Sequence, residues 1–217
     1  MTGHIGGPIA GTSMTLHAVP PTTELASCQA LLTGLVARQA WAERELLVRF
    51  TARVERVITR ITGDVSADLD DRVQETFVRV LERVHLIRDA DSLPAFVTRV
   101  AVNVARESLR ARRRRRWLSF FGPADVPEAA APVASDDVRG AYLAFYRVVD
   151  TLGEDERIVF VLRHVEGMEL REVGEVVGLS LATVKRRLAE AQRTFLARAS
   201  VVPDLEDWLS GSRKWST

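Results

Sequence analysis

Apolar residues recur at three- and four-residue spacings along most of this 217-residue chain, and that pattern constrains the fold more than any other feature. Such spacing places side chains on one face of an α-helix, whereas a half-buried strand alternates at every second residue. No stretch of the sequence shows that alternation. The sequence therefore predicts an all-α protein.

The apolar stripes locate the expected helices. They comprise Leu47, Phe50, Val54, Val57, Ile58 and Ile61, then Leu69, Val73, Phe77, Val80, Leu81 and Val84, then Tyr142, Tyr146, Val149 and Leu152, and then Ile158, Val161, Leu162 and Val165. Gly63 and Asp64 separate the first two stripes, and residues 85–92 are expected to form a loop. Pro94 suits the first turn of a further helix, where its missing N–H costs nothing.

The composition changes abruptly over residues 118–136, which contain Pro123, Pro127, Pro132 and several alanines. This composition is typical of a linker. We therefore expect two small helical domains joined by a flexible linker. The expected divisions are an N-terminal flexible tail (1–24), a first domain (25–117), the linker (118–136), a second domain (137–199) and a C-terminal tail (200–217).

The numbers of cysteine and histidine residues limit the classes of protein to which this chain can belong. A single cysteine, Cys28, excludes an internal disulfide, so a reducing cytoplasm is the expected location. The four histidines lie far apart in the chain, and we expect no metal site and no cofactor. No apolar run approaches the roughly 18 residues that cross a bilayer, so no membrane insertion is expected.

A basic segment between Arg99 and Arg116 contains eight arginines and one acid, Glu107, although the whole chain has a net charge of only +1. The rest of the chain is therefore acidic, and this asymmetry favours a polyanionic partner. One stripe of the helix after Pro94 is apolar, and a separate stripe consists of Arg99, Asn103, Arg106, Arg110 and Arg113. That second stripe is able to follow a phosphate backbone, with Asn103 placed to contact a base edge.

Four aromatic residues near this segment are able to stack on unpaired bases: Phe96, Trp117, Phe120 and Phe121. For Phe96 a place in the core is the better interpretation.

Residues 169–195 have the pattern of a helix-turn-helix. Gly174 suits a close approach of two helices, Gly178 suits a left-handed turn, and Ser180 is a good N-cap for the second helix. Leu170, Val173 and Val177 of the first helix, and Leu181, Val184, Leu188, Ala191 and Phe195 of the second, are expected to face the core. The outer face of the second helix contains Thr183, Lys185, Arg186, Arg187, Ala189, Glu190 and Arg193, a composition suited to the major groove of DNA. The alternative is an ordinary helical hairpin with a solvated basic face.

Four motifs in this order resemble the sigma factors of bacterial RNA polymerase, in particular the extracytoplasmic-function (ECF) type. Leu69–Phe77 (LDDRVQETF) is similar to the region 2.2 signature AEDLVQETF, and residues 96–110 are similar to the region 2.3–2.4 pattern WLxxIAxNxAxDxLR. Residues 152–157 resemble the LPxxxR opening of region 4, and residues 165–169 with the helix-turn-helix complete that region. The chain departs from these patterns at Arg72, Phe96, Val102 and Gly153.

The resemblance implies a protein that is not an enzyme and that directs promoter recognition, DNA melting and transcription initiation. Its partners would be promoter DNA, core RNA polymerase through the β′ clamp helices and the β flap, and an anti-sigma factor. The implied polymerase-binding residues are Asp70, Asp71, Gln74 and Glu75. The residues implied for the −10 element are Arg99, Asn103, Arg106, Arg110 and Arg113, together with the loop 85–92. Those implied for the −35 element are Ser180, Thr183, Lys185, Arg186, Arg187 and Arg193.

Two other classes of protein were weighed against this interpretation. A helix-turn-helix transcription regulator would act without replacing sigma and would bind duplex DNA alone, usually as a dimer. A nuclease would need a cluster of carboxylates for metal, and the nearest approach is Asp70, Asp71 and Glu75 on one helical surface without a partner motif. In the C-terminal tail, Trp208 and Leu209 suggest a short docking helix, with a disordered end as the alternative.

Overall fold

The computed structural model describes residues 27–63, 68–119 and 136–205. Within these ranges the secondary structure is helical and contains no strand, so the all-α prediction is confirmed. Several features expected from the sequence lie outside the described residues, namely the N-terminal tail, most of the linker with Phe120 and Phe121, and the docking helix at Trp208.

The first group of helices comprises α1 (Cys28–Val36), α2 (Ala40–Thr62), α3 (Leu69–Arg83) and α4 (Leu93–Ser119). Two short 3₁₀ turns, η1 (Val84–Leu86) and η2 (Ala90–Ser92), lie between α3 and α4, where the loop was predicted. The second group comprises α5 (Asp136–Val149), α6 (Glu154–Phe160), the π-helical turn η3 (Val161–Val165), α7 (Leu170–Val177), α8 (Leu181–Ala199) and the 3₁₀ turn η4 (Pro203–Leu205). The helices of the described ranges are too short or too polar to cross a bilayer.

The helix boundaries follow the local chemistry of the sequence. α2 ends at Gly63, whose φ of 67° lies in the left-handed region that glycine adopts without strain. Pro94 is the second residue of α4, in the turn whose N–H groups have no intrahelical partner. Both predictions are confirmed.

The core contains most of the predicted apolar residues, with two corrections. Leu47 is 43% exposed, and its neighbour Leu46 is fully buried in its place. Leu181 is 36% exposed, although Val184, Leu188, Ala191 and Phe195 of the same helix are buried as predicted. At 100° per residue, adjacent positions at the edge of a helical stripe are difficult to separate by spacing alone.

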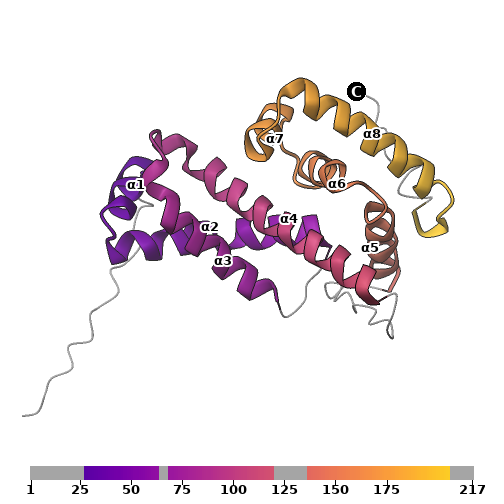
Figure 1. Cartoon of the computed structure of the whole chain (residues 1–217), viewed down its shortest axis with the longest axis horizontal. Helices are drawn as coiled ribbons and strands as arrows, with labels where there is room; N and C mark the ends of the chain where they lie inside the picture. The colour runs from indigo at the N-terminus through magenta and orange to yellow at the C-terminus, as the bar shows by residue number, and fades with distance from the viewer. Residues whose placement is uncertain (1–26, 64–67, 120–135, 206–217) are drawn as a thin grey trace, which may run out of the picture.

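α4 lies at the centre of the molecule (Figure 1). It packs against α2 and α3 on one side, and α7 and α6 of the second group contact it on the other. Val102 and Thr98, which lie outside the predicted apolar stripe, are therefore buried together with Val97 and Val104. The two groups of helices thus share an interface, which the sequence pattern did not predict.

Candidate nucleic-acid interface

The turn between α7 and α8 has the geometry of a helix-turn-helix. Gly178 ends α7 with a φ of 73°, and its N–H donates to the carbonyl of Gly174. A Cβ on Gly174 would lie 2.9 Å from the carbonyl oxygen of Leu179, so any larger residue would push the turn away. The hydroxyl of Ser180 accepts a hydrogen bond from the N–H of Thr183 at 3.3 Å and caps α8. The predicted roles of these two glycines and of Ser180 are confirmed.

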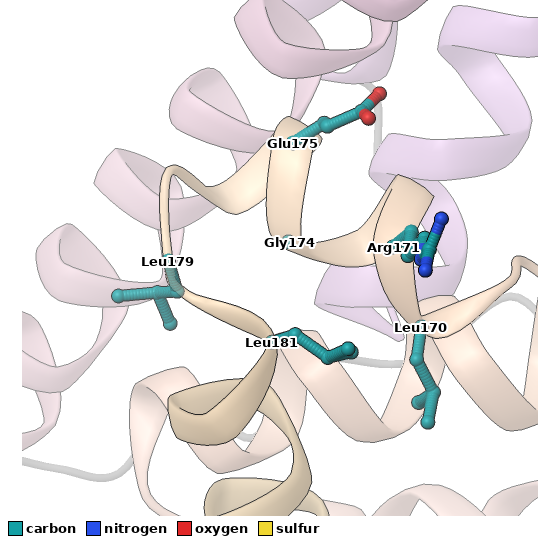
Figure 2. A pocket seen from close by; sticks show the side chains of 6 residues that line it. All are labelled: Leu170, Arg171, Gly174, Glu175, Leu179 and Leu181. Atoms are coloured by element: carbon teal, nitrogen blue, oxygen red, sulfur yellow. The ribbon is translucent and has the colours of Figure 1, made fainter.

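A small hollow lies around this turn, between the start of α7 and the start of α8 (Figure 2). It is lined by Leu170, Arg171, Gly174, Glu175, Leu179 and Leu181. Leu181 is the first residue of α8 and borders this hollow, which explains why its side chain stays partly exposed instead of joining the core.

The outer face of α8 is basic and largely open to solvent. Lys185 and Arg186 are exposed in the first half of the helix. Arg193, also exposed, pairs with Glu190 one turn before it. Thr183 is half-buried, with its hydroxyl 2.9 Å from that of Ser180. Arg187 differs from the others, because its guanidinium pairs with Asp155 at the start of α6.

The acidic segment of α3 is also exposed. The predicted polymerase-binding residues Asp70, Asp71, Gln74 and Glu75 all have exposed side chains on this helix. Arg79 binds Glu75 at 2.6 Å and Glu107 of α4 at 2.7 Å, so it joins α3 to α4. The hydrogen bond from Arg79 holds the pKa of Glu107 below its ordinary value.

The predicted DNA-binding stripe of α4 lies on the side of the helix that faces the second group of helices, although Arg99, Arg110 and Arg113 remain exposed. Arg99 donates to the main-chain carbonyl of Glu175, at 2.6 Å. Arg113 donates to the carbonyl of Leu152, at 3.1 Å. These two contacts lie near opposite ends of the stripe.

The middle of the stripe makes ion pairs with the first turn of α6. Arg106 lies 3.5 Å from Glu154 and 3.3 Å from Asp155, and it also donates to the side-chain oxygen of Asn103 at 3.3 Å. Arg110 binds Glu154 at 2.9 Å, and this pairing raises the pKa of Arg110. Each arginine of the predicted stripe therefore donates to a residue of the second group.

A buried arginine, Arg157, joins the two groups of helices; the sequence identified it only as the last residue of the 152–157 motif, without a structural role. Arg157 of α6 is 2% exposed, and its guanidinium donates to the carbonyls of Ile61 at 2.6 Å and Thr62 at 2.8 Å. It also pairs with Asp150, which in turn binds Arg112 of α4 at 3.1 Å. Within the sequence, the position of a charged residue directly before the apolar run Ile158–Leu162 was the available signal.

Two further contacts join the same surfaces. The hydroxyl of Tyr146 in α5 donates to the carbonyl of Arg60, at 3.1 Å. Arg60 binds Glu166 at 2.7 Å, and Arg56 binds the same carboxylate at 3.2 Å. The end of α2 is therefore in contact with α5, α6 and the residue that follows η3.

Known families match both groups of helices. Sigma-70 region 2 matches residues 46–115, and sigma-70 region 4 matches residues 142–194. Together the two matches cover more than half of the chain.

The chain is also similar in sequence to individual sigma factors. The chain is 26% identical over 159 residues to the ECF RNA polymerase sigma-E factor of Escherichia coli strain K12, covering 68% of this chain and 81% of that protein. It is 28% identical over 145 residues to the probable RNA polymerase sigma factor RfaY of Xanthomonas campestris. That match covers 65% of this chain but only 36% of RfaY, so the chain spans about a third of the length of that relative.

Two solved structures share the fold. One is CnrH in complex with the cytosolic domain of CnrY, with a TM-score of 0.60 and 22% identity, covering 82% of this chain and 99% of that one. The other is the sigma factor RpoE in complex with the anti-sigma factor NepR from Bartonella quintana, with a TM-score of 0.54 and 18% identity, covering 73% of this chain and 97% of that one.

With its matches to sigma-70 regions 2 and 4, this pair of helical domains, the second with a helix-turn-helix, is that of a DNA-binding protein of the transcription apparatus. The chain belongs to the sigma-70 family and is a sigma factor of the ECF type. Its function is therefore to bind core RNA polymerase and to direct transcription initiation at promoters.

Proposed function

We propose that this sigma factor divides its tasks among three surfaces. The acidic segment of α3 (Asp70, Asp71, Gln74 and Glu75) binds the β′ clamp helices of core RNA polymerase, and the second domain contacts the β flap. The stripe Arg99, Asn103, Arg106, Arg110 and Arg113 of α4 captures the −10 element. The outer face of α8, with Ser180, Thr183, Lys185, Arg186, Arg187 and Arg193, reads the −35 element. The protein works in the cytoplasm, carries out no bond chemistry, and has an anti-sigma factor as a further partner.

The observation that carries this proposal is the exposed basic start of α8, directly after the turn at Gly178 and Ser180. Lys185 and Arg186 lie within the first two turns of the helix, where a recognition helix contacts base edges and phosphates. Thr183 adds a methyl group that suits contact with thymine.

The exposed acids of α3 support the polymerase-binding surface. Asp70 and Asp71 are exposed in the first turn of the helix, and Gln74 and Glu75 follow one turn later. A cluster of negative and amide groups of this kind suits a basic partner surface. Within the described part of the chain, these carboxylates belong to no cluster of three or more potential metal ligands.

At the −10 element the protein acts by binding DNA and breaks or forms no covalent bond. A protein that captures unpaired bases offsets the cost of unstacking, a few kcal/mol per base, with contacts to the released strand. Arginines supply those contacts to phosphates, and the amide of Asn103 is able to pair with a base edge. Because each domain alone forms a small interface, binding both to the polymerase raises their effective concentration at the promoter.

The polymerase surface is tested by co-elution of the full chain with bacterial core RNA polymerase on a sizing column. Asp71→Arg is expected to abolish stoichiometric co-elution, because it reverses one charge of the acidic segment. Glu82→Arg is the matched control, since Glu82 is exposed on the same helix but lies outside that segment. Equal loss, or equal retention, in the two variants would contradict the assignment of α3.

The DNA surface is tested by run-off transcription with reconstituted holoenzyme on promoters selected from a randomised library. Arg186→Ala is expected to reduce transcription, whereas Arg198→Ala, exposed near the far end of α8, is the control that should retain it. DNA binding by the free protein with no effect on polymerase would instead favour a helix-turn-helix regulator that acts without replacing sigma.

A further inference from the structure

The arginine stripe of α4 and the start of α6 form a charged interface within one chain. Arg106 and Arg110, the central arginines of the stripe, bind Glu154 and Asp155 at distances of 2.9–3.5 Å. The arginines that are proposed to bind the phosphates of the −10 element are thus already paired with carboxylates of the same chain. A nucleic-acid strand and the start of α6 cannot pair with these guanidinium groups in the same way at the same time.

A single carboxylate connects both proposed DNA-binding helices. Asp155 accepts from Arg106 of α4 at 3.3 Å, and it also pairs with Arg187 of α8. The residues that would read the −10 element and those that would read the −35 element are therefore linked through one acid. Separation of α6 from α4 would release Arg106 and would leave Asp155 with Arg187 alone.

The interface divides into a buried anchor and a more exposed charged part. The anchor is Arg157, whose side chain is buried between Asp150 and the end of α2. In the charged part, Arg110 is 57% exposed and Asp155 is 35% exposed, whereas Arg106, at 18%, and Glu154, at 15%, are more buried. Each of these side chains is more exposed than Arg157, and the pairs that include Arg110 or Asp155 are partly open to water and therefore screened by salt, so this part is able to open and close.

We propose that Glu154 and Asp155 form an autoinhibitory contact, in which the start of region 4 covers the DNA-binding stripe of region 2 in the free protein. This proposal rests on the proposed role of α4 at the −10 element. The two carboxylates take the place of DNA phosphates, and they need no partner protein because both sides belong to one chain. The two domains must separate if they are to reach the −10 and −35 elements when the protein is bound to polymerase. This movement of the second domain exposes the stripe.

The test compares the full chain with the variant Glu154→Gln/Asp155→Asn, which keeps the shape of both side chains and removes their charge. The matched control is Glu172→Gln/Asp204→Asn, which removes the same charge from exposed positions of the same domain, away from α4 and from the outer face of α8. In Glu172→Gln the glutamine is still able to complete the capping box at the start of α7. Circular dichroism establishes that each variant retains its helices.

The first measurement is binding of the free protein to a fluorescent single-stranded DNA of mixed sequence at low salt. The Glu154→Gln/Asp155→Asn variant is expected to bind about five- to tenfold more tightly than the unmodified chain and the control, because it loses the three ion pairs that compete with DNA for Arg106 and Arg110. Adding Arg106→Ala/Arg110→Ala should remove this gain. Equal affinity of the variant and the control, or a gain that persists without the two arginines, would overturn the proposal.

The second measurement reports the contact without DNA. Nitroxide labels at Val48→Cys and Val201→Cys, both highly exposed positions in the two domains, are placed in a Cys28→Ser background. Double electron–electron resonance should give a narrow distance distribution for the unmodified chain, and a broader one for Glu154→Gln/Asp155→Asn or at about 1 M salt, where charges are screened within about 3 Å. An unchanged distribution in both cases would overturn the autoinhibitory contact.

The two proposals fail in different ways. If the contact opens as expected but Arg106→Ala/Arg110→Ala has no effect on promoter opening by the holoenzyme, the role of α4 at the −10 element is wrong. If the arginines matter for promoter opening but the label distances never change, the autoinhibitory contact alone is wrong.

Discussion

The guanidinium of Arg157 in α6 donates to the main-chain carbonyl of Thr62, the last residue of α2, at 2.8 Å. It donates to the carbonyl of Ile61 as well, at 2.6 Å. The last carbonyls of a helix have no partner within the helix. The second domain therefore caps a helix of the first domain, and hydrogen bonds across the interface satisfy the carbonyls at the end of α2.

Replacement of Arg157 is expected to weaken the whole molecule. Arg157→Ala leaves the carbonyls of Ile61 and Thr62 without their donor and leaves Asp150 with Arg112 but without Arg157, and we expect a loss of about 3 kcal/mol in the free energy of unfolding. Arg157→Lys keeps the charge but loses the planar fork, so it should recover only part of this loss. Urea denaturation measures the change, with Arg147→Ala on the exposed face of α5 as the control. A loss no larger than that of the control would contradict the capping role.

A pair of glycine variants separates backbone strain from the contact between domains. Gly63 and Gly178 have φ values of 67° and 73°, so alanine at either position is strained by about 1–2 kcal/mol. A Cβ at Gly63 would also lie 2.4 Å from Cδ1 of Tyr146 in α5, whereas a Cβ at Gly178 meets nothing within 4 Å. Thermal denaturation should show the larger loss for Gly63→Ala. Equal losses would indicate that α5 moves away from α2 at little cost.

The sequence predicted the local parts of this structure well, and the reason is physical. The roles of Gly178 and Ser180 depend on backbone conformation and on one hydrogen bond within three residues, so the pattern alone identifies them. The exposure of Asp71 and Lys185 follows equally from helical spacing. The assignment of these exposed residues to polymerase or DNA stays a prediction.

The surroundings of the arginine stripe were beyond the reach of such patterns. Arg106 meets Asp155, 49 residues later, and Arg157 meets Ile61, 96 residues earlier. Spacing within a helix states which residues share a face but not what covers that face. Only the acidic charge of the remaining chain indicated that an internal partner for the arginines was available.

His164 gives the protein a pH dependence in the mildly acidic range. Burial, with a smaller contribution from Arg163, lowers the pKa of His164 from 6.5 to about 4. Because the unfolded chain binds the proton first, stability is intact above pH 6.5 and falls as the pH drops from about 6.5 to about 4. The half-buried ring reduces the effect to roughly 1 kcal/mol.

Urea denaturation at several pH values, compared with His164→Gln, measures this contribution. The variant should lose the slope between pH 6.5 and about 4, since glutamine does not titrate. The hydrogen-bonding partner Gln192 stays in place in both proteins. The same slope in the variant would assign the titration to other groups.

The N-cap of α8 is expected to contribute to the stability of the helix-turn-helix. Ser180→Ala removes the side-chain acceptor for the N–H of Thr183, and we expect a loss of about 1 kcal/mol in the free energy of unfolding. Ser180→Asn supplies another good capping side chain and should restore most of it. Failure of asparagine to restore stability would show that the hydroxyl contact with Thr183, at 2.9 Å, matters more than the cap.

The salt dependence of promoter binding should distinguish two arginines on the same face of α8. Arg186 is exposed and takes part in none of the ion pairs found within the described ranges, whereas Arg193 must first leave Glu190 to reach a phosphate. Each phosphate contact contributes about 0.9 to the slope of log affinity against log salt concentration. Arg186→Ala is therefore expected to lower the slope by about 0.9, and Arg193→Ala by less. Fluorescence anisotropy of holoenzyme on promoter DNA at several salt concentrations measures both slopes. An unchanged slope in Arg186→Ala, with lower affinity for one sequence only, would show that Arg186 contacts a base and not a phosphate.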